Sequence, residues 1–156
     1  MRIPRVYADT SVFGGVFDEE FRAPSRAFFE QVRLGRFALV TSALVRREVL
    51  AAPQNVQEHF TEFLHIAEVL GISDEAVELQ GAYVSAGIVT ERSLADALHV
   101  ALATAAGCAL IVSWNFRHIV NFQRIRMYNA INTLQGYGNI AIFSPLEVIA
   151  DEDEGV

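Results

Sequence analysis

Short apolar runs alternate with longer helical segments along the chain, and this alternation constrains the fold more than any other feature. The run over 108–112, Cys-Ala-Leu-Ile-Val, is apolar at every position, as expected of a strand buried on both faces of a sheet. Strands that alternate with helices are joined by crossovers, which make neighbouring strands parallel. We therefore predict an α/β three-layer sandwich, with a central, mainly parallel sheet between helices.

Local signals place the individual elements. We predict strands over residues 6–8, 37–41, 67–72, 108–112 and 140–143. We predict helices over 24–34, 43–51, 55–66, 93–106 and 116–135, the last in one or two pieces. Another helix begins after Ser73 and ends at Gly87, and Ser144 opens a capping box with Glu147. Segment 67–72 could also extend the helix before it, but its composition favours the strand.

Length and composition indicate one domain with an ordinary core. The chain has 156 residues, of which 52% are hydrophobic, so we expect a single domain over 1–150 and a disordered acidic tail over 151–156. The single cysteine excludes a disulfide framework and a cysteine-rich zinc site. Neither a signal peptide nor an apolar run of about 18 residues is visible, so we expect a soluble, cytoplasmic protein without membrane contact.

Charge is unevenly distributed. The net charge is −7, but five of the 19 acids lie in the last ten residues, which leaves 12 basic and 14 acidic residues over 1–146. Every basic residue is arginine, and the absence of lysine excludes Walker-A nucleotide binding, Schiff-base chemistry and Ser-Lys catalysis. Arginine can still bind phosphate through its planar guanidinium group.

Three acidic side chains occur at positions that are predicted to be partly or fully buried. Asp9 directly follows the strand over 6–8, whereas Glu48 and Asp96 lie within apolar helices. A buried carboxylate is costly unless it is paired or binds a cation. Because the carboxyl ends of parallel strands meet at one edge of a sheet, these three acids could converge on a site suited to Mg²⁺ or Mn²⁺.

Each acid also has a simpler interpretation. Asp9 could cap a following helix through its side chain. Glu48 could be a surface acid paired with an arginine, since Arg46 and Arg47 are adjacent in sequence. Asp96 could complete a capping box with Ser93. These interpretations are independent of one another, so together they explain the shared edge less well than a common site does.

Four motifs in order resemble the PIN-domain family, and among its members the VapC-like ribonuclease toxins. The motifs are Tyr7–Val12, Arg47–Val49, Asp96–Ala103 and Leu110–Phe116. The resemblance covers essentially the whole chain and implies a Mg²⁺- or Mn²⁺-dependent endoribonuclease that cuts single-stranded RNA with metal-activated water. It also implies that Asp9, Glu48 and Asp96 bind the metal, that an antitoxin protein is a partner, and that the chain forms a homodimer.

One position departs from the family pattern. The family often has a fourth acid after the strand that we place over 108–112, and here that position is Asn115. We include Asn115 in the catalytic group, but its neutral side chain lowers the charge of the site from −4 to −3. A two-metal mechanism is therefore in doubt, and we expect at most one tight metal site. The alternative is a weakened or inactive PIN-fold protein that binds RNA or protein.

Candidate substrate contacts lie near the same strand ends. The segment 116–126 contains Arg117, Arg124 and Arg126 and no acid, so we assign Arg117 and Arg124 to RNA binding. A solvated helix face is the simpler interpretation of this segment. Hydroxyl groups that could position water or phosphate are also found there, although capping is at least as good an explanation for them: Thr10, Ser11 and Ser113.

The histidines have no metal-binding spacing. His99 lies three residues after Asp96 and could donate to that acid, but a buried core histidine is the better interpretation. A third functional class, aspartyl phosphoryl transfer, would suit Asp9 at a strand end. Its familiar forms use a lysine, which this chain lacks.

Overall fold

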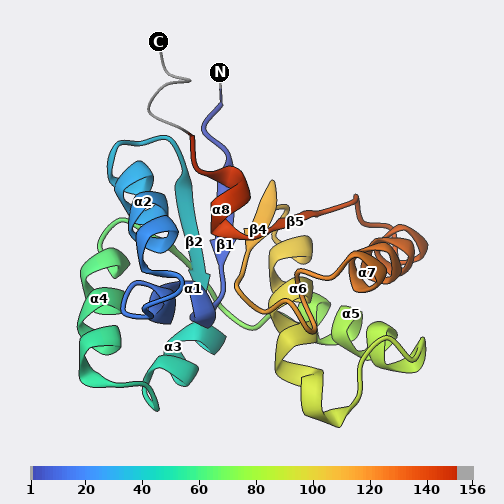
Figure 1. Ribbon diagram of the computed structural model, residues 1–156. Coiled ribbons are helices and arrows are strands. Elements are labelled where there is room, and N and C mark those ends of the chain that lie inside the picture. The colour runs from blue at the N-terminus through green and yellow to red at the C-terminus, as the bar shows by residue number, and fades with distance from the viewer. Residues whose placement is uncertain (1, 151–156) are drawn as a thin grey trace.

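A computed structural model describes residues 2–150 and shows one five-stranded sheet (Figure 1). All pairings are parallel, and the strand order is β3-β2-β1-β4-β5. The strands are β1 (Arg5–Ala8), β2 (Ala38–Ser42), β3 (Glu68–Leu70), β4 (Leu110–Val112) and β5 (Ala141–Phe143). The predicted α/β architecture with a parallel central sheet is confirmed.

Helices cover both faces of the sheet (Figure 1). One layer contains α1 (Thr10–Gly15), α2 (Arg22–Arg33), α3 (Ala43–Val49), α4 (Gln54–Leu64) and α8 (Pro145–Val148). The other contains α5 (Asp74–Ser85), the 3₁₀ turn η1 (Glu91–Ser93), α6 (Leu94–Ala105) and α7 (Phe122–Leu134). Because parallel crossovers are right-handed, building the sheet in one direction and then the other places the helices on opposite faces.

The direction of building reverses between β1 and β4. The chain first adds β2 and β3 on one side of β1, then returns to the other side for β4 and β5. Ala8 pairs with Val112 in the register of these two strands. The residues that follow, Asp9 and Ser113, therefore emerge side by side at the carboxyl edge, where sheets of this kind bind their ligands.

The central strands form the middle of the core. Tyr7 and Ala8 of β1 and Ile111 and Val112 of β4 are fully buried, as the continuous apolar runs predict. At the edge of the sheet, β3 is largely exposed. Residues at the ends of β1 and β4 are thus held by a rigid support.

The structure differs from the predicted elements at two places. Residues 10–15 form helix α1, which was not predicted because the segment is short and ends in two glycines. The predicted helix over 116–135 begins only at Phe122, where Asn121 accepts a hydrogen bond from the backbone N–H of Arg124. Residues 116–120 instead form a turn, because the backbone N–H groups of residues 117–120 donate to the side-chain and backbone oxygens of Asn115.

Two further expectations concern membrane-spanning helices and the C-terminal tail. Within residues 2–150, no helix is long and apolar enough to span a membrane. The predicted disordered tail over 151–156 lies outside the described residues.

Candidate active site

Asp9 lies at the centre of the carboxyl edge and is held by two serines. Its side chain is 4% exposed, and its backbone is extended at the start of α1. The hydroxyls of Ser11 and Ser113 donate to its two carboxylate oxygens, each over 2.6 Å. Asp9 occupies the N-cap position of α1 but makes no side-chain capping bond, so the simple capping interpretation is wrong.

Burial sets the charge properties of Asp9. Loss of hydration raises the pKa of Asp9 above its ordinary value of 3.8, and the charge of Glu48 raises it further. The electrostatic interaction with His99 and the hydrogen bonds from Ser11 and Ser113 lower the pKa of Asp9 but do not cancel the effect of burial. Asp9 is therefore a carboxylate whose negative charge is poorly compensated by the protein.

Glu48 reaches the same edge from helix α3. Its Oε1 accepts hydrogen bonds from Thr10 Oγ1 over 2.6 Å and from His99 Nε2 over 2.7 Å. Burial raises the pKa of Glu48, but the interactions with His99, the hydrogen bond from Thr10 and the charge of Arg47 together bring the pKa below its ordinary value of 4.5. Within residues 2–150 Glu48 forms no ion pair with arginine, so it is not the arginine-paired surface acid of the simpler interpretation.

A buried chain of hydrogen bonds fixes the orientation of His99. Its Nδ1 lies 2.7 Å from the Tyr7 hydroxyl, which lies 2.8 Å from Ser42 Oγ. Since a carboxylate only accepts, Nε2 carries the proton that is donated to Glu48, and in the neutral ring Nδ1 accepts from Tyr7. Burial raises the pKa of Tyr7 well above 10, so this hydroxyl keeps its proton. His99 is buried as predicted, but its partner is Glu48 and not Asp96.

Asp96 projects from the first turn of α6. Its Oδ1 accepts a hydrogen bond from Asn115 Nδ2 over 3.0 Å. Burial, together with the charges of Asp9 and Glu48, raises the pKa of Asp96 above 3.8, against the opposing effect of His118. Ser93 forms its capping box with Thr90, so the capping interpretation of Asp96 is wrong.

Asn115 presents its amide nitrogen, not its oxygen, to the acids. Asn115 Oδ1 accepts hydrogen bonds from the backbone N–H groups of Arg117 and His118, over 3.2 and 2.9 Å. These bonds fix the orientation of the amide, since a rotated group would place its NH₂ against two donors. The carbonyl oxygen of Asn115 is therefore turned away from Asp96.

The donor set fits a hard divalent cation in chemistry and charge. The charge of Glu48 raises the pKa of Asp9, and the charges of Asp9 and Glu48 raise the pKa of Asp96. Asp96 Oδ2 and Glu48 Oε2 make no hydrogen bond within residues 2–150. In the described part of the chain, no three His, Cys, Asp or Glu side chains are positioned as a ready metal cluster. Coordination of one ion by Asp9, Glu48 and Asp96 would therefore require side-chain rotation.

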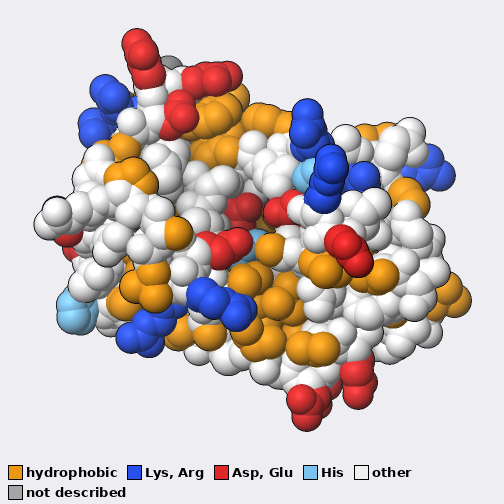
Figure 2. Space-filling model, turned by 90° about the horizontal axis from the view of Figure 1, so that it is seen from below, with side chains coloured by type: hydrophobic (Ala, Val, Ile, Leu, Met, Phe, Trp, Pro, Cys, Tyr) orange, Lys and Arg blue, Asp and Glu red, His pale blue; other side chains and the backbone are white. Residues whose placement is uncertain are grey.

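The acids lie in a hollow at this edge of the molecule. Figure 2 shows acidic side chains at the centre of the face, with basic side chains along parts of its rim. Arg117 is exposed, and its guanidinium has no partner among residues 2–150. The guanidinium of Arg124 donates to the carbonyl of Ile88, so it is anchored to the neighbouring loop. The hydroxyls of Thr10, Ser11 and Ser113 are all bound to the acids.

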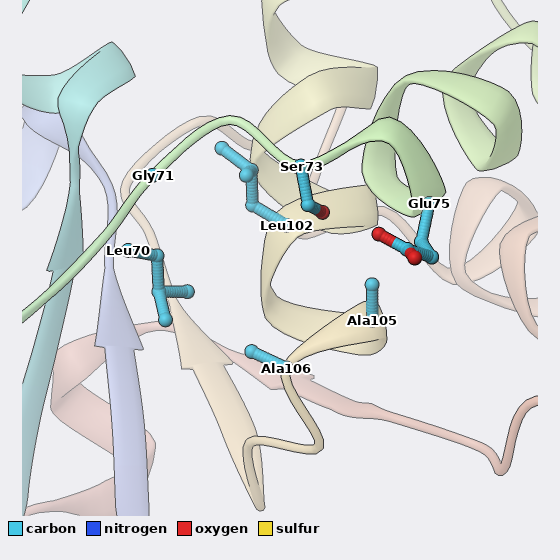
Figure 3. A pocket seen from close by; sticks show the side chains of 7 residues that line it. All are labelled: Leu70, Gly71, Ser73, Glu75, Leu102, Ala105 and Ala106. Atoms are coloured by element: carbon cyan, nitrogen blue, oxygen red, sulfur yellow. The ribbon is translucent and has the colours of Figure 1, made fainter.

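A separate pocket of about 260 Å³ lies between the end of β3 and helices α5 and α6 (Figure 3). Its lining includes none of the predicted site residues: Leu70, Gly71, Ser73, Glu75, Leu102, Ala105 and Ala106. We therefore place the candidate active site in the acidic hollow alone.

Sequence reasoning did not assign a role to Tyr7 or identify Glu48 as the partner of His99. The available signal was a polar residue within the apolar helix over 93–106, one turn after an acid. That signal shows that His99 needs a partner, but the partner is 51 residues away in sequence.

A comparison with known protein families identifies the family of this chain. A family model described as the PIN domain matches residues 6–119, so the chain belongs to the PIN-domain family. The resemblance predicted from the four motifs is thereby confirmed. The comparison with curated proteins gives no match.

Solved structures with the same fold include proteins that were solved bound to DNA. VapBC2 from Rickettsia felis, bound to a DNA fragment from its promoter, has a TM-score of 0.56 and 14% identity, and the match covers 88% of this chain and 96% of that chain. FitAcB from Neisseria gonorrhoeae has a TM-score of 0.58 and 13% identity, with 92% and 99% covered. FitAB bound to the IR36 DNA fragment has a TM-score of 0.60 and 13% identity, with 90% and 95% covered. At such identities the likeness establishes the fold alone.

Proposed function

We propose that the protein is a metal-dependent endoribonuclease that cleaves single-stranded RNA. The observation that supports this proposal is that Asp9 and Glu48 lie close enough to Asp96 for their charges to raise its pKa, beside the point where the strand order reverses. The three acids come from different elements, and burial leaves two of them with raised pKa values. Such an arrangement costs stability, and a bound cation is the simplest compensation.

Asp9, Glu48 and Asp96 would hold Mg²⁺ or Mn²⁺, which when bound neutralises phosphate charge and lowers the pKa of water. Ser11 and Ser113 keep Asp9 in position, while His99 and Thr10 keep Glu48 in position. Asp96 has a raised pKa and an oxygen without a hydrogen-bond partner in residues 2–150, which suits it to accept a proton. Asn115 holds Asp96 from the other side.

Arginine side chains would bind the RNA backbone. Arg117 is exposed and free to contact phosphate within the described structure, whereas Arg124 is already anchored to Ile88 and would contribute mainly its charge. The acids repel phosphate unless a cation is bound, so we expect RNA binding to depend on both the metal and these arginines.

The biological setting that fits best is a type II toxin–antitoxin pair. VapBC2 and FitAB are complexes solved with DNA, and this chain has their fold. By analogy, the chain would be the ribonuclease toxin, act in the cytoplasm as a homodimer, and be inhibited by an antitoxin protein. Purification with the product of the adjacent gene, followed by light scattering, tests this assignment.

The test of the activity is a cleavage time course on mixed single-stranded RNA with Mn²⁺. The parent protein should cut, and Asp96→Asn should lose activity while keeping its circular dichroism spectrum. Asp74→Asn, the same change at an exposed position on α5, is the matched control and should cut normally. Full activity of Asp96→Asn would refute the site assignment.

Asn115 favours one alternative function. Because its amide donates to Asp96 where the family often has an acid, the protein could bind RNA or a partner without cleaving. In that case neither the parent nor Asp96→Asn would cut RNA at any Mn²⁺ concentration, and binding would persist without metal.

A further inference from the structure

Three aromatic side chains lie together beside the acids, and we call them the aromatic shelf: Phe21, Trp114 and Phe116. The rings of Phe21 and Trp114 stack with centroids 4.2 Å apart and an angle of 17°. The ring of Phe116 lies 6.1 Å from Trp114 and 6.3 Å from Phe21, tilted against both. Trp114 is 8% exposed, whereas Phe116 is 51% exposed. Phe116 is thus an exposed ring on an aromatic support.

The support is held rigidly. Trp114 Nε1 donates to Ser25 Oγ over 2.9 Å, and a Cβ added at Gly15 would lie only 2.8 Å from the same nitrogen. Asn115 Oδ1 and its backbone carbonyl accept from four backbone N–H groups of the following turn, which carries Phe116. A ring that is already fixed loses little conformational entropy when a ligand stacks on it.

The aromatic shelf adjoins the acids through the backbone. The N–H of Trp114 donates to Ser11 Oγ over 2.9 Å, and Ser11 donates to Asp9. Asn115, the neighbour of Phe116, contacts Asp96. Consecutive Cα atoms lie about 3.8 Å apart. The Cα of Phe116 is therefore that close to the Cα of Asn115, whose side chain contacts Asp96.

The charges around Phe116 suit a nucleotide. Arg117 follows it directly, is exposed, and has no partner in the described part of the chain. Figure 2 shows basic side chains on the rim of the acidic hollow. An exposed ring beside an unpaired guanidinium matches the two parts of an unpaired nucleotide, because the base can stack and the phosphate can bind arginine.

We propose that Phe116 is a stacking subsite for one unpaired nucleobase, with Arg117 on the adjoining phosphate. This subsite rests on the proposed ribonuclease function and specifies its substrate. A base within a duplex is stacked on both faces and cannot offer one to Phe116, so the subsite selects single-stranded RNA. Stacking tolerates every base, so it confers little sequence preference.

Trp114 provides the readout, because it is the only tryptophan of the chain and lies against Phe116. The Asp96→Asn protein should keep RNA intact, and with Mn²⁺ present it is titrated with an eight-nucleotide oligoadenylate or with an abasic oligomer of equal length. Oligoadenylate should quench Trp114 saturably and bind more tightly than the abasic oligomer. Phe116→Ala in the same background should weaken oligoadenylate binding by about 5- to 140-fold and leave abasic binding unchanged.

Two further variants separate stacking from a structural role. Phe116→Tyr keeps an aromatic face and should retain binding, whereas Phe116→Leu keeps only apolar bulk and should lose it. Phe122→Ala is the matched control: this phenylalanine is 70% exposed, but the Arg126 guanidinium already lies over its ring at 5.6 Å. Its removal should leave the affinity unchanged.

The outcomes show separately whether Phe116 is a stacking subsite and whether the protein is a ribonuclease. Equal binding of oligoadenylate by Phe116→Ala and its parent overturns the subsite, even if the native protein cleaves RNA. Full retention of oligoadenylate binding by Phe116→Leu also overturns it, because apolar bulk without an aromatic face would then be sufficient for binding. Phe116-dependent binding without cleavage by the native protein supports the subsite and refutes the ribonuclease.

Discussion

At the scale of single residues, neutral hydrogen-bond donors hold two of the three acids of the candidate site, Asp9 and Asp96. Ser11 and Ser113 bind Asp9, and the amide of Asn115 binds Asp96. These donors fix each carboxylate but add no positive charge. The site therefore keeps a negative charge that a bound cation can neutralise.

Gly15 shows how close that packing is. A Cβ at Gly15 would lie 2.5 Å from Ser25 Oγ and 2.8 Å from Trp114 Nε1, whereas a Cβ at Gly14 would meet nothing within 4 Å. Gly15→Ala should destabilise the fold by about 1–3 kcal/mol, because stacking on Phe21 prevents Trp114 from moving aside. Gly14→Ala should stabilise helix α1 by about 0.5–1 kcal/mol. Denaturant unfolding of both variants checks this, and equal stabilities would contradict the close approach.

Asn115→Asp should have opposite effects with and without metal. The variant replaces the donor to Asp96 Oδ1 by an acceptor, so the metal-free fold should lose about 1–3 kcal/mol. The added carboxylate should tighten Mn²⁺ binding, because the turn that holds residue 115 remains capped by a side-chain oxygen. Calorimetric titration with Mn²⁺ and thermal unfolding measure the two effects. An unchanged Mn²⁺ titration would show that position 115 does not contribute to metal binding.

At the scale of elements, short helices begin where the strands of the candidate site end. Helix α1 starts directly after β1, and α3 starts directly after β2. Ser42 is the N-cap of α3, and its Oγ accepts from the N–H of Val45. The same hydroxyl lies against Tyr7, so this cap also connects the helix to the chain that holds His99.

Because Ser42 has both roles, its replacement should lower the free energy of unfolding more than replacement of Ser73, which only caps a helix. Ser73 caps α5 in the same way, since its Oγ accepts from the N–H of Ala76 over 3.2 Å, but among residues 2–150 this hydroxyl has no second, buried partner. Ser73→Ala should cost about 1 kcal/mol. Ser42→Ala should cost about 2–4 kcal/mol, because a buried hydrogen bond to Tyr7 is lost as well. Unfolding free energies measured in urea decide this, and equal costs would mean that the Tyr7 contact adds nothing.

At the scale of the whole molecule, the fold gathers uncompensated charge at one edge. The pKa of Asp96 is raised, mainly by burial, so its ionised form is less stable in the folded state than in the unfolded state. This cost is absent below the unfolded pKa, near 3.8, and develops as the pH rises through the folded pKa. The metal-free protein should therefore be less stable at neutral pH than it would be without this carboxylate.

Asp96→Asn should consequently stabilise the metal-free protein at pH 7 and much less at pH 3.5, where the carboxyl group is mostly protonated in both states. Mn²⁺ at about 100 times its Kd should stabilise the parent by about 2.7 kcal/mol and should stabilise the variant far less. Thermal unfolding at both pH values, with chelator or Mn²⁺, tests this. A parent that gains nothing from Mn²⁺ would argue against a metal site, whatever the variant does.

The sequence by itself determined the class of fold and the positions of the acids along the chain. Alternating strands and helices require a parallel sheet, and a polar residue directly after a buried strand must lie at its carboxyl edge, as Asp9 does. These inferences succeed because they depend on hydrogen bonding and hydrophobic patterning over a few neighbouring residues. The same local signals did not predict α1, because its two glycines disfavour a helix and its stability comes from tertiary packing.

Only the tertiary structure decided which partner each side chain found. Glu48 and His99 are 51 residues apart, Ser25 and Trp114 are 89 apart, and both pairs meet because the strand order reverses beside β1. The orientation of the Asn115 amide likewise follows from a turn that the helical pattern over 116–135 concealed. Such contacts depend on how separate elements pack together, and sequence spacing within one element carries no information about that packing.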